Sequence, residues 1–408
     1  MSPSRTPASR RSPVGARPPH AVHVLGGAGD GSGTPSAGAT AHARSLAQGL
    51  SARGVRVTVC ARQDGALRHV FTGTGADFRA LPGRSEAETA TALRAACADA
   101  DLVHAHGQHA GLLAALALGG RRHGELPLVV AWHPPPGPAA SQAARAEAAR
   151  DLVARLLARR VARAATVVLG ATTALVDAAR RSGARDVRLA PAPIPVDNPD
   201  VPGAQAPHGD GEQAAGHKAR AGIGALDRPL VLTAGRLDGR RGHETALTAS
   251  RAWRRLDPPP LLAVAGEGPK RAVLQRRIDD EALPVRLLGR RDDALQLLAG
   301  ADIALLPGYC QGRSLIAQEA LRCGVPLVAA DAGGVPELVG DAAVLVPRGD
   351  ADSLAAAVLA LLADPDRRAA LTEAGRARAR TWPSEDDAAA QVLSLYDEVV
   401  TRPALPAR

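Results

Sequence analysis

Residues 303–336 read IALLPGYCQGRSLIAQEALRCGVPLVAADAGGVP, and this stretch decides the fold. It begins with a short apolar run typical of a buried strand and continues through a Pro-Gly loop to Ser314, a residue type that often caps a helix start. The helix is expected to end near Gly324, because a glycine with Pro326 just beyond it is a common stop signal. Residues 326–330 are apolar enough to form a strand buried on both faces. This order of elements predicts a parallel α/β sheet.

The loop before this helix is expected to lie where ligands bind. In a parallel sheet, a strand followed by a helix leaves the free N–H groups of the helix at the carboxyl edge, where anions and nucleotides are bound. Two polar side chains stand there, Gln311 in the loop and Glu319 in the helix. Spacing alone explains Glu319 equally well as a solvated helix residue.

Length and composition limit the possible classes of protein. A chain of 408 residues is too long for one core, so two domains are expected. Its hydrophobic fraction of 46% and mean hydropathy of −0.07 are typical of a globular protein. No stretch approaches the roughly 18 uninterrupted apolar residues of a membrane helix. Residues 1–19 are rich in Ser, Pro and Arg and lack the apolar core of a secretory signal, so we expect a disordered tail.

The basic charge does not indicate nucleic-acid binding. The net charge is +9, and nearly all of the basic residues are arginines scattered among alanines. Aromatic residues make up 2% of the chain, which is too few for base-stacking platforms. The four cysteines show no CxxC spacing, so neither a zinc ribbon nor a disulfide framework is expected, and a reducing cytoplasm suits them.

Apolar segments alternate with helical patterns along most of the chain, which predicts parallel α/β architecture twice over. The first unit opens with a short strand and the glycine-rich run 26–33, which resembles a dinucleotide-binding loop. This loop is longer than GxGxxG, and the acidic residue expected about 20 positions further on is missing. We expect a tail at 1–19, a first α/β domain at 20–195, a linker or loose insertion at 196–228, a second α/β domain at 229–382, and a C-terminal helix within 383–408 that crosses back to the first domain.

Motifs in the second half resemble a known family. GRLDGRRG (235–242), AGEGP (265–269), VRLLG (285–289) and the Q-x7-E pattern followed by ADAGGVPELV occur in the order and spacing of the retaining family 4 glycosyltransferases. The first half fits through its glycine loop, DLVHAHG and a strand ending in Trp132-His133. The resemblance covers roughly residues 21–400. It implies a GT-B fold, in which two Rossmann-like domains face each other across a cleft. It also implies an enzyme that moves a sugar from a UDP- or GDP-sugar donor to an acceptor without an essential metal or cofactor.

The resemblance also implies which residues form the site. Catalytic roles fall on His133, Arg236, Arg241 and Gln311. Donor-binding roles fall on Gly26, Gly27, Gly235, Gly266, Gly268, Arg290, Ser314, Leu315 and Glu319. His42 and His106 are expected on the acceptor side.

The chemistry of sugar transfer explains these residue types. Diphosphate is the leaving group, so negative charge grows on its oxygens, and arginines and helix N-termini can stabilise it. Two positions depart from the family pattern: Gln311 replaces a glutamate and Arg241 replaces a lysine. Glutamine can hydrogen-bond sugar hydroxyls but cannot supply negative charge or accept a proton. Arginine keeps the charge of lysine with a different geometry.

Two other functions remain open on the sequence. His104 and His106, with His109 and His133, could form the HxH metal site of an amidohydrolase, because alternate strand residues face the same way. That fold would need eight strand–helix units in one ring. Gln311 alternatively suggests a sugar-nucleotide-binding protein without catalytic activity.

A cationic helix leaves membrane contact open as well. On the expected helix 144–163, the apolar residues Leu152, Val153, Leu156, Leu157 and Val161 form one stripe among arginines. Such a helix can lie on anionic lipid at the inner membrane face. Burial of the stripe against the sheet, as in any α/β domain, is the stronger expectation, with the arginines facing solvent. The sequence does not name the acceptor, the donor sugar or its base.

Overall fold

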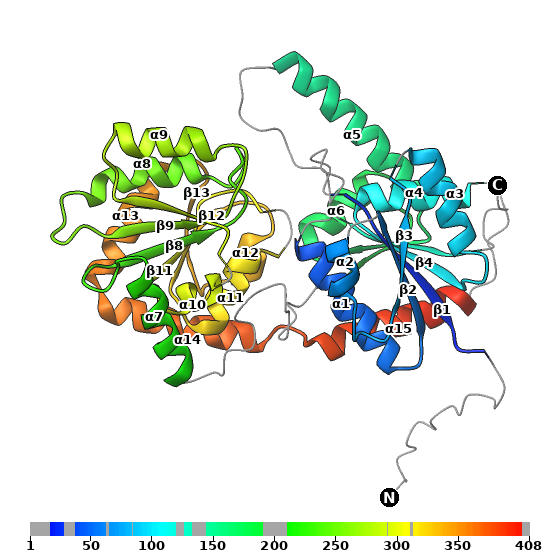
Figure 1. Ribbon diagram of the computed structural model, residues 1–408. Helices are drawn as coiled ribbons and strands as arrows, with labels where there is room; N and C mark the ends of the chain where they lie inside the picture. Colours follow the sequence, from blue (N-terminus) through cyan, green and yellow to red (C-terminus); the bar gives the residue numbers. More distant parts are fainter. Residues whose placement is uncertain are drawn as a thin grey trace, which may run out of the picture.

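Two parallel sheets lie side by side in the protein (Figure 1). The computed structural model describes residues 17–27, 37–62, 65–83, 85–119, 126–132, 144–190, 210–291, 293–310 and 313–401. The first sheet has the spatial order β3-β2-β1-β4-β5-β6-β7. Its strands are β1 (His20–Leu25), β2 (Arg56–Arg62), β3 (Asp77–Leu81), β4 (Leu102–His106), β5 (Leu128–Ala131), β6 (Val167–Gly170) and β7 (Val187–Leu189).

The second sheet repeats the same plan with the order β10-β9-β8-β11-β12-β13. Each sheet therefore starts in its middle, grows to one side, and then returns to the other side of its first strand. Its strands are β8 (Leu230–Ala234), β9 (Leu261–Ala265), β10 (Val285–Gly289), β11 (Ile303–Leu306), β12 (Leu327–Asp331) and β13 (Val344–Pro347). The expectation of two Rossmann-like parallel sheets is confirmed.

Helices cover both faces of the first sheet. Alternate residues of β1 show the two faces: Val22 and Val24 belong to one core cluster, while Ala21 and Leu25 belong to the other. A strand buried on both faces needs apolar residues throughout, as these strands have. The helices between the strands are α1 (Ala37–Ala52), α2 (Gly65–Val70), α3 (Glu86–Ala96), α4 (Gln108–Leu118), α5 (Ala144–Ala164) and α6 (Thr173–Arg181).

The second domain contains the helix that the opening stretch predicted. Ser314 is the N-cap of α11 and its hydroxyl accepts from the Ala317 amide, while Gly324 ends the helix in the left-handed conformation (φ 75°). Both predicted ends are confirmed. The helices of this half are α7 (Asp210–Gly222), α8 (His243–Trp253), α9 (Arg271–Asp280), α10 (Ala294–Ala299), α11 (Leu315–Cys323), α12 (Val335–Val339), α13 (Ala351–Ala363) and α14 (Pro365–Arg380).

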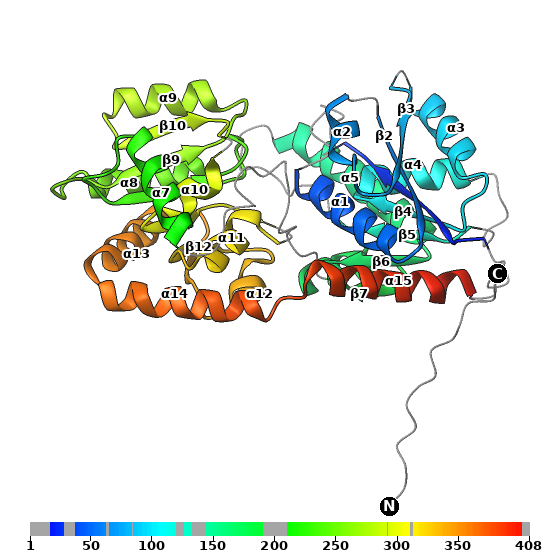
Figure 2. The same ribbon diagram turned by 60° about the horizontal axis from the view of Figure 1, so that its bottom comes forward.

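The last helix, α15 (Glu385–Thr401), packs under the first domain against α1 (Figure 2). Val392, Leu395 and Val399 join the core cluster on that face of the first sheet. Glu398 pairs with Arg188 of β7 at 2.6 Å. The end of the chain therefore crosses back from the second domain, where α14 packs, to the first.

Helix α7 corrects the expectation of a loose insertion at 196–228. It packs against α10, where a Cβ placed on Gly216 would lie 2.9 Å from the Cα of Gly300. Arg220 also donates to the carbonyl oxygens of Gly300 and Ala225 at 3.0 and 2.6 Å. The sequence pattern did not show this helix because glycine and alanine, not large apolar residues, make the contact.

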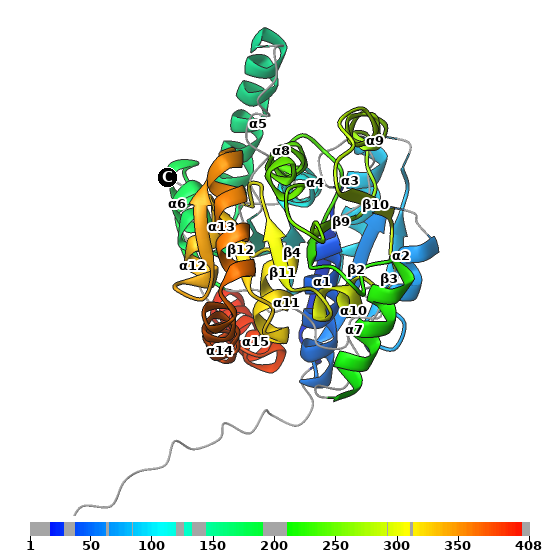
Figure 3. The same ribbon diagram turned by 90° about the vertical axis from the view of Figure 1, so that its left-hand side faces the viewer.

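Helix α5 projects away from the body of the first domain (Figures 1 and 3). In its C-terminal half, Ala158, Val161 and Ala162 are buried. The stripe that the sequence expected against the sheet is largely exposed: Leu152 59%, Val153 55%, Leu156 55% and Leu157 40%. Of the predicted stripe, Val161 alone is buried.

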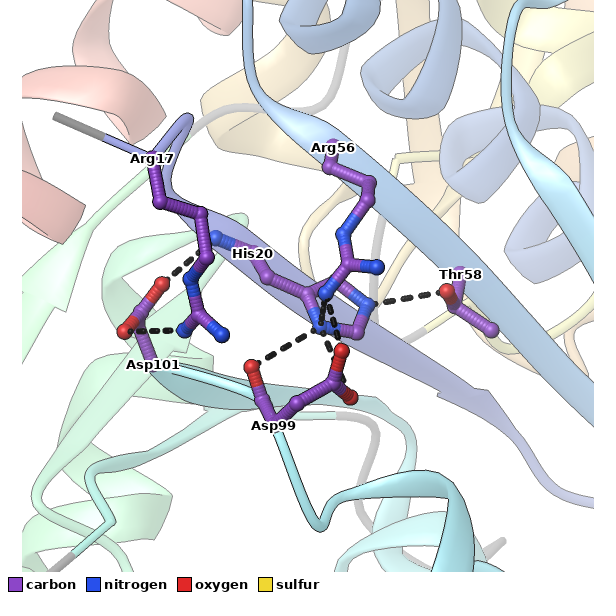
Figure 4. Close-up of polar contacts among 6 residues, drawn as sticks. All are labelled: Arg17, His20, Arg56, Thr58, Asp99 and Asp101. Atoms are coloured by element: carbon purple, nitrogen blue, oxygen red, sulfur yellow. Dashed lines mark hydrogen bonds and ion pairs between the residues drawn. The ribbon is translucent and has the colours of Figure 1, made fainter. Parts of the chain in front are cut away.

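A polar network closes the amino edge of the first sheet (Figure 4). His20 bonds to Thr58 Oγ1 at 2.9 Å, and Arg56 pairs with Asp99. Arg17 donates to Asp101 at 3.1 Å. Burial is the main reason that the pKa of His20 is lowered. These residues lie at the strand ends opposite the carboxyl edge, so they hold the chain in register and are no part of the candidate site.

Candidate functional site

In each sheet the order in which strands are added reverses beside the first strand. This switch lies between β1 and β4 in one domain and between β8 and β11 in the other. Ligands of open α/β sheets bind outside the carboxyl ends of the strands at such a switch point. The residues predicted from the sequence follow these strands in both domains. The amidohydrolase alternative is wrong about the fold, because the chain forms two open sheets and not a closed barrel.

Glycines let three loops of the second domain pack backbone against backbone. A Cβ on Gly266 would lie 1.9 Å from the carbonyl oxygen of Gly235, and one on Gly268 would lie 2.4 Å from that of Leu237. The amide of Leu237 donates to the carbonyl of Glu267 at 2.9 Å. Any side chain at Gly266 or Gly268 would separate the loops. These glycines therefore fix the shape of the loop that carries the arginines.

Arg236 and Arg241 stand on this loop, and both are exposed. Gly242 allows the loop to press against the strand-end of β11, since a Cβ there would lie 2.3 Å from the carbonyl oxygen of Pro307. His243 starts the following helix and bonds to the Arg236 carbonyl at 3.3 Å, with its pKa lowered mainly by burial. Among the described residues, no carboxylate forms an ion pair with Arg241. The two guanidinium groups are accessible to a bound anion.

The segment that leads into α11 contacts this loop, since the Tyr309 amide donates to the Arg240 carbonyl oxygen at 3.2 Å, and α11 follows at the same edge of the sheet. The amides of its first turn, starting at Leu315, have no partner inside the helix, as at any helix start, and their dipoles favour negative charge. Ser314 is 5% exposed and serves as the cap. Arg290 follows the end of β10 and is exposed. Gln311 lies outside the described residues, as does His133.

Glu319 is buried, which corrects the alternative of a solvated helix residue. Its side chain is 3% exposed, and both Nε and Nη2 of Arg322 donate to its Oε2 oxygen, at 2.9 and 2.6 Å. Arg322 is one helical turn away and remains partly exposed. The carboxylate is thus held in one orientation in the interior of the second domain, close to the N-terminus of α11.

Gly26 and Gly27, the described residues of the first domain's glycine loop, contact the start of α4. A Cβ on Gly26 would lie 2.4 Å from the Ala110 amide nitrogen, and the Gly27 amide donates to His109 Nδ1 at 3.2 Å. His109 Nε2 lies 3.4 Å from Glu86, which also pairs with Arg62. The sequence had offered His109 as a metal ligand. In the structure it orients the first residues of the glycine loop.

Three histidines meet inside the first domain. His23 on β1 lies beside His104 on the neighbouring strand β4, and His106 follows two residues later on the same face. One ring nitrogen of each lies within 4.8 Å of the others. All three rings are at most 2% exposed, and His42 of α1 meets His106 edge to face at 5.8 Å. The structure thus brings together His42 and His106, the two residues expected on the acceptor side.

A contact between the domains was not visible in the sequence. The backbone amide and hydroxyl of Thr173, at the start of α6, donate to Glu337 of α12 at 2.7 and 2.6 Å. Nearby, Arg313 stacks on Trp382 with 4.9 Å between its guanidinium carbon and the ring centre. Burial and the neighbouring Arg378 lower the pKa of Arg313 to about 10. Nothing in the sequence distinguishes Arg313 from other loop arginines. In the structure it joins the start of α11 to Trp382, in the segment between α14 and α15.

Family comparisons agree with this architecture. Residues 37–195 match the family described as "Glycosyl transferase 4-like domain", and residues 218–378 match "Glycosyl transferases group 1". A D-inositol 3-phosphate glycosyltransferase of Salinispora tropica is 30% identical over 365 residues, covering 82% of this chain and 72% of that protein. The chain belongs to the group 1 glycosyltransferases. The family predicted from the motifs is therefore confirmed.

Other relatives match over shorter stretches. A GDP-mannose-dependent phosphatidylinositol monomannoside mannosyltransferase of Corynebacterium glutamicum is 36% identical over 159 residues, which is 36% of this chain and 42% of that protein. The match thus spans less than half of that relative. The structure of Anabaena HepE, solved with UDP, superposes with a TM-score of 0.74 at 19% identity, covering 93% of this chain and 100% of HepE. This likeness establishes the GT-B fold.

Proposed function

We propose that the protein transfers a sugar from a nucleotide-sugar donor to an acceptor, with retention of the anomeric configuration and without a metal ion. The observation that carries this proposal is the carboxyl edge of the second sheet, where exposed Arg236 and Arg241 follow β8 and the N-terminus of α11 follows the neighbouring strand β11. A diphosphate leaving group needs positive charge at that point. Two guanidinium groups and a helix N-terminus supply it from the chain itself.

The remaining residues take roles around this anion. Ser314 and the Leu315 amide face the diphosphate, and buried Glu319 accepts hydrogen bonds from the ribose hydroxyls. Gln311 hydrogen-bonds the donor sugar, while His133, Gly27, His42 and His106 border the reacting carbon and the acceptor. Glu337 and Thr173 hold the two domains at a fixed distance across the cleft.

The experiment is a nucleotide-release assay with UDP-glucose, ADP-glucose and GDP-mannose as donors. D-inositol 3-phosphate and phosphatidylinositol monomannoside serve as acceptors, because relatives are named for them. We expect transfer with one donor, equal rates with and without a chelator, and an NMR spectrum that shows the anomeric configuration of the donor in the product. Binding of nucleotide without turnover on any acceptor would favour the non-catalytic alternative, and an inverted product would overturn retention.

We further propose that the protein works in the cytoplasm, in weak contact with the inner membrane face through α5. None of the helices in the described part of the chain is both long and apolar enough to cross a bilayer. The exposed side chains of Leu152, Val153 and Leu156 project from the domain on the same helix as the exposed Arg155 and Arg159. Apolar side chains between arginines fit an anionic lipid surface, where each basic residue contributes about 1 kcal/mol.

Vesicle co-sedimentation tests this contact. We expect binding to phosphatidylglycerol vesicles that weakens with salt, and a loss of binding when Leu152→Gln and Leu156→Gln are combined. Val273→Gln, a matched exposed apolar residue on α9, is the control and should bind as the wild type does. Failure to pellet even at low salt would overturn the proposal. Binding that is lost at physiological salt and is indifferent to the leucines would assign it to charge alone.

A further inference from the structure

A chain of hydrogen bonds crosses the interior of the first domain, from the C-terminal helix toward the carboxyl edge of the sheet. The Tyr396 hydroxyl of α15 lies 2.6 Å from His104 Nδ1 and 3.0 Å from His23 Nε2. His23 Nδ1 lies in turn 3.2 Å from His106 Nε2. None of these four side chains is more than 3% exposed. The chain is therefore shielded from bulk water, although His104 Nε2 has no hydrogen-bond partner among the described residues.

His23, His104 and Tyr396 are neutral near physiological pH. Burial lowers the pKa of His23 to about 3 and that of His104 well below its ordinary value, and the nearby His42 lowers both further. Burial also raises the pKa of Tyr396. A neutral imidazole carries its proton on one nitrogen and accepts with the other. His23 is bonded through both ring nitrogens, so it must donate on one side and accept on the other.

This constraint makes the direction of one bond decide all of them. If the Tyr396 O–H donates to His104, its oxygen accepts from His23 Nε2–H, and His23 Nδ1 accepts from His106 Nε2–H. If instead Tyr396 donates to His23, the proton of His23 sits on Nδ1 and that of His106 moves to its own Nδ1. The hydroxyl of a residue on the last helix thus selects the tautomer of a histidine on β4.

The distances favour the first direction. O–H donors make shorter hydrogen bonds than N–H donors, so the 2.6 Å contact to His104 fits the tyrosine proton and the 3.0 Å contact to His23 fits an imidazole N–H. All three histidines then carry the proton on Nε2. In this state His106 donates its Nε2 proton to His23 Nδ1.

The far end of the chain lies where the acceptor is expected. His106 is the last residue of β4, and its ring packs edge to face against His42 with an interplanar angle of 75°. His42 is partly exposed and sits in α1, which follows the glycine loop. The buried chain therefore connects α15 to the two histidines assigned to the acceptor side.

We propose that Tyr396 is a positioning residue, which fixes the tautomer and orientation of His106 and so prepares the acceptor side of the site. Its link to the acceptor rests on the proposed function, whereas its control of the histidine tautomers does not. The C-terminal helix then has a second role besides completing the core of the first domain. It sets the hydrogen-bonding character of a site residue on the same face of the sheet.

The first experiment needs no substrate. Long-range ¹H–¹⁵N spectra of the imidazole rings are compared for chelator-treated wild type and Tyr396→Phe, which removes only the hydroxyl. We expect Nε2–H tautomers of His23, His104 and His106 in the wild type. In the variant, His23 Nε2–H has lost its acceptor, so we expect the proton of His106 to move to Nδ1. An unchanged His106 tautomer would overturn the proposal.

The second experiment measures catalysis with a matched control. Glu398→Gln removes the ion pair with Arg188 on the same helix and leaves the histidine chain intact, so it reports what loosening α15 does by itself. We expect Tyr396→Phe to lower kcat/KM for the acceptor roughly 10- to 100-fold, as a misplaced site group does, with donor hydrolysis in water within about two-fold of wild type. D-inositol 3-phosphate or phosphatidylinositol monomannoside is the acceptor, whichever the wild type uses.

Three outcomes would contradict the inference. Equal losses in Tyr396→Phe and Glu398→Gln would show that only helix docking matters. Additive effects of Tyr396→Phe and His106→Gln would show that the two residues act separately. A shift of the three histidine signals on adding Zn²⁺ would assign the cluster to a metal site instead. If the wild type transfers no sugar at all, the proposed function fails, while the tautomer experiment still decides the role of Tyr396.

Discussion

Replacing Glu319 by glutamine separates the ion pair that the structure shows from the ribose contact that we propose for the same carboxylate. Glu319 is 3% exposed and holds Arg322 through two hydrogen bonds to a single oxygen, Oε2. The proposed function also places the ribose hydroxyls against it. Glutamine keeps the shape of the side chain and removes the charge. Arg322→Gln is the matched variant, since it breaks the same ion pair and leaves the carboxylate.

The expected magnitudes follow from the burial of the two partners. An exposed pair one turn apart on a helix contributes about 0.2–0.5 kcal/mol, whereas a hydrogen bond to a buried charged group contributes about 1.5–3 kcal/mol. Because Glu319 is buried and Arg322 is about one-quarter exposed, we expect either variant to lower the free energy of unfolding by about 2 kcal/mol. This corresponds to roughly 4–8 °C in Tm for a domain of this size.

Nucleotide affinity distinguishes the two variants. Losing charge-assisted bonds to the ribose is worth about 2 kcal/mol, so Glu319→Gln should raise the Kd of UDP or GDP about 30-fold. Arg322→Gln should leave that Kd within a few-fold of wild type. Calorimetric titration with the ribonucleotide and with its 2′,3′-dideoxy form measures both effects. The wild type should prefer the ribonucleotide and Glu319→Gln should not. Equal affinities of wild type and Glu319→Gln would reduce Glu319 to an ion-pair partner of Arg322.

Three further predictions concern other parts of the site. Arg236→Ala and Arg241→Ala should each lower turnover about 100-fold, as loss of a charge stabiliser does. Arg240→Ala, on the same loop, should keep turnover within a few-fold of wild type. Equal rates for all three variants would remove both arginines from the site. Gln311→Glu should change the rate or the donor preference across a donor panel, and unchanged kinetics would argue against sugar contact. Burial sets the folded-state pKa of His23 at about 3, whereas the unfolded value is 6.5. The contribution of neutral His23 to the free energy of unfolding is therefore full above pH 6.5 and is lost as the pH falls toward 3. At pH 5 the free energy of unfolding should be about 2 kcal/mol lower than at pH 7. Thermal unfolding at the two pH values measures this difference. An unchanged stability would mean that the histidine has an ordinary pKa in the folded protein.

The sequence was sufficient for the fold because local signals and family motifs agreed. Ser314 and Gly324 bracket α11 through their own capping and left-handed conformations, and such preferences act within a few residues. Apolar runs marked the strands for the same reason. The sequence also singled out the glycines of the second domain, although as donor-binding residues. The structure shows that Gly266 and Gly268 first serve to let two loops touch.

Contacts between residues far apart in the chain could not be predicted from the sequence. Helix α7 makes its contact through Gly216, which carries no apolar signal, and the stripe on α5 has the same pattern whether it is buried or exposed. The sequence placed His104 and His106 on one face but gave no sign that Tyr396 lies between His104 and His23, because nothing local marks a partner some 290 residues away. Periodicity tells which side of an element a residue occupies. Only the packing of the elements decides what stands opposite, and that packing sets the burial, the pKa values and the hydrogen-bond direction of the site.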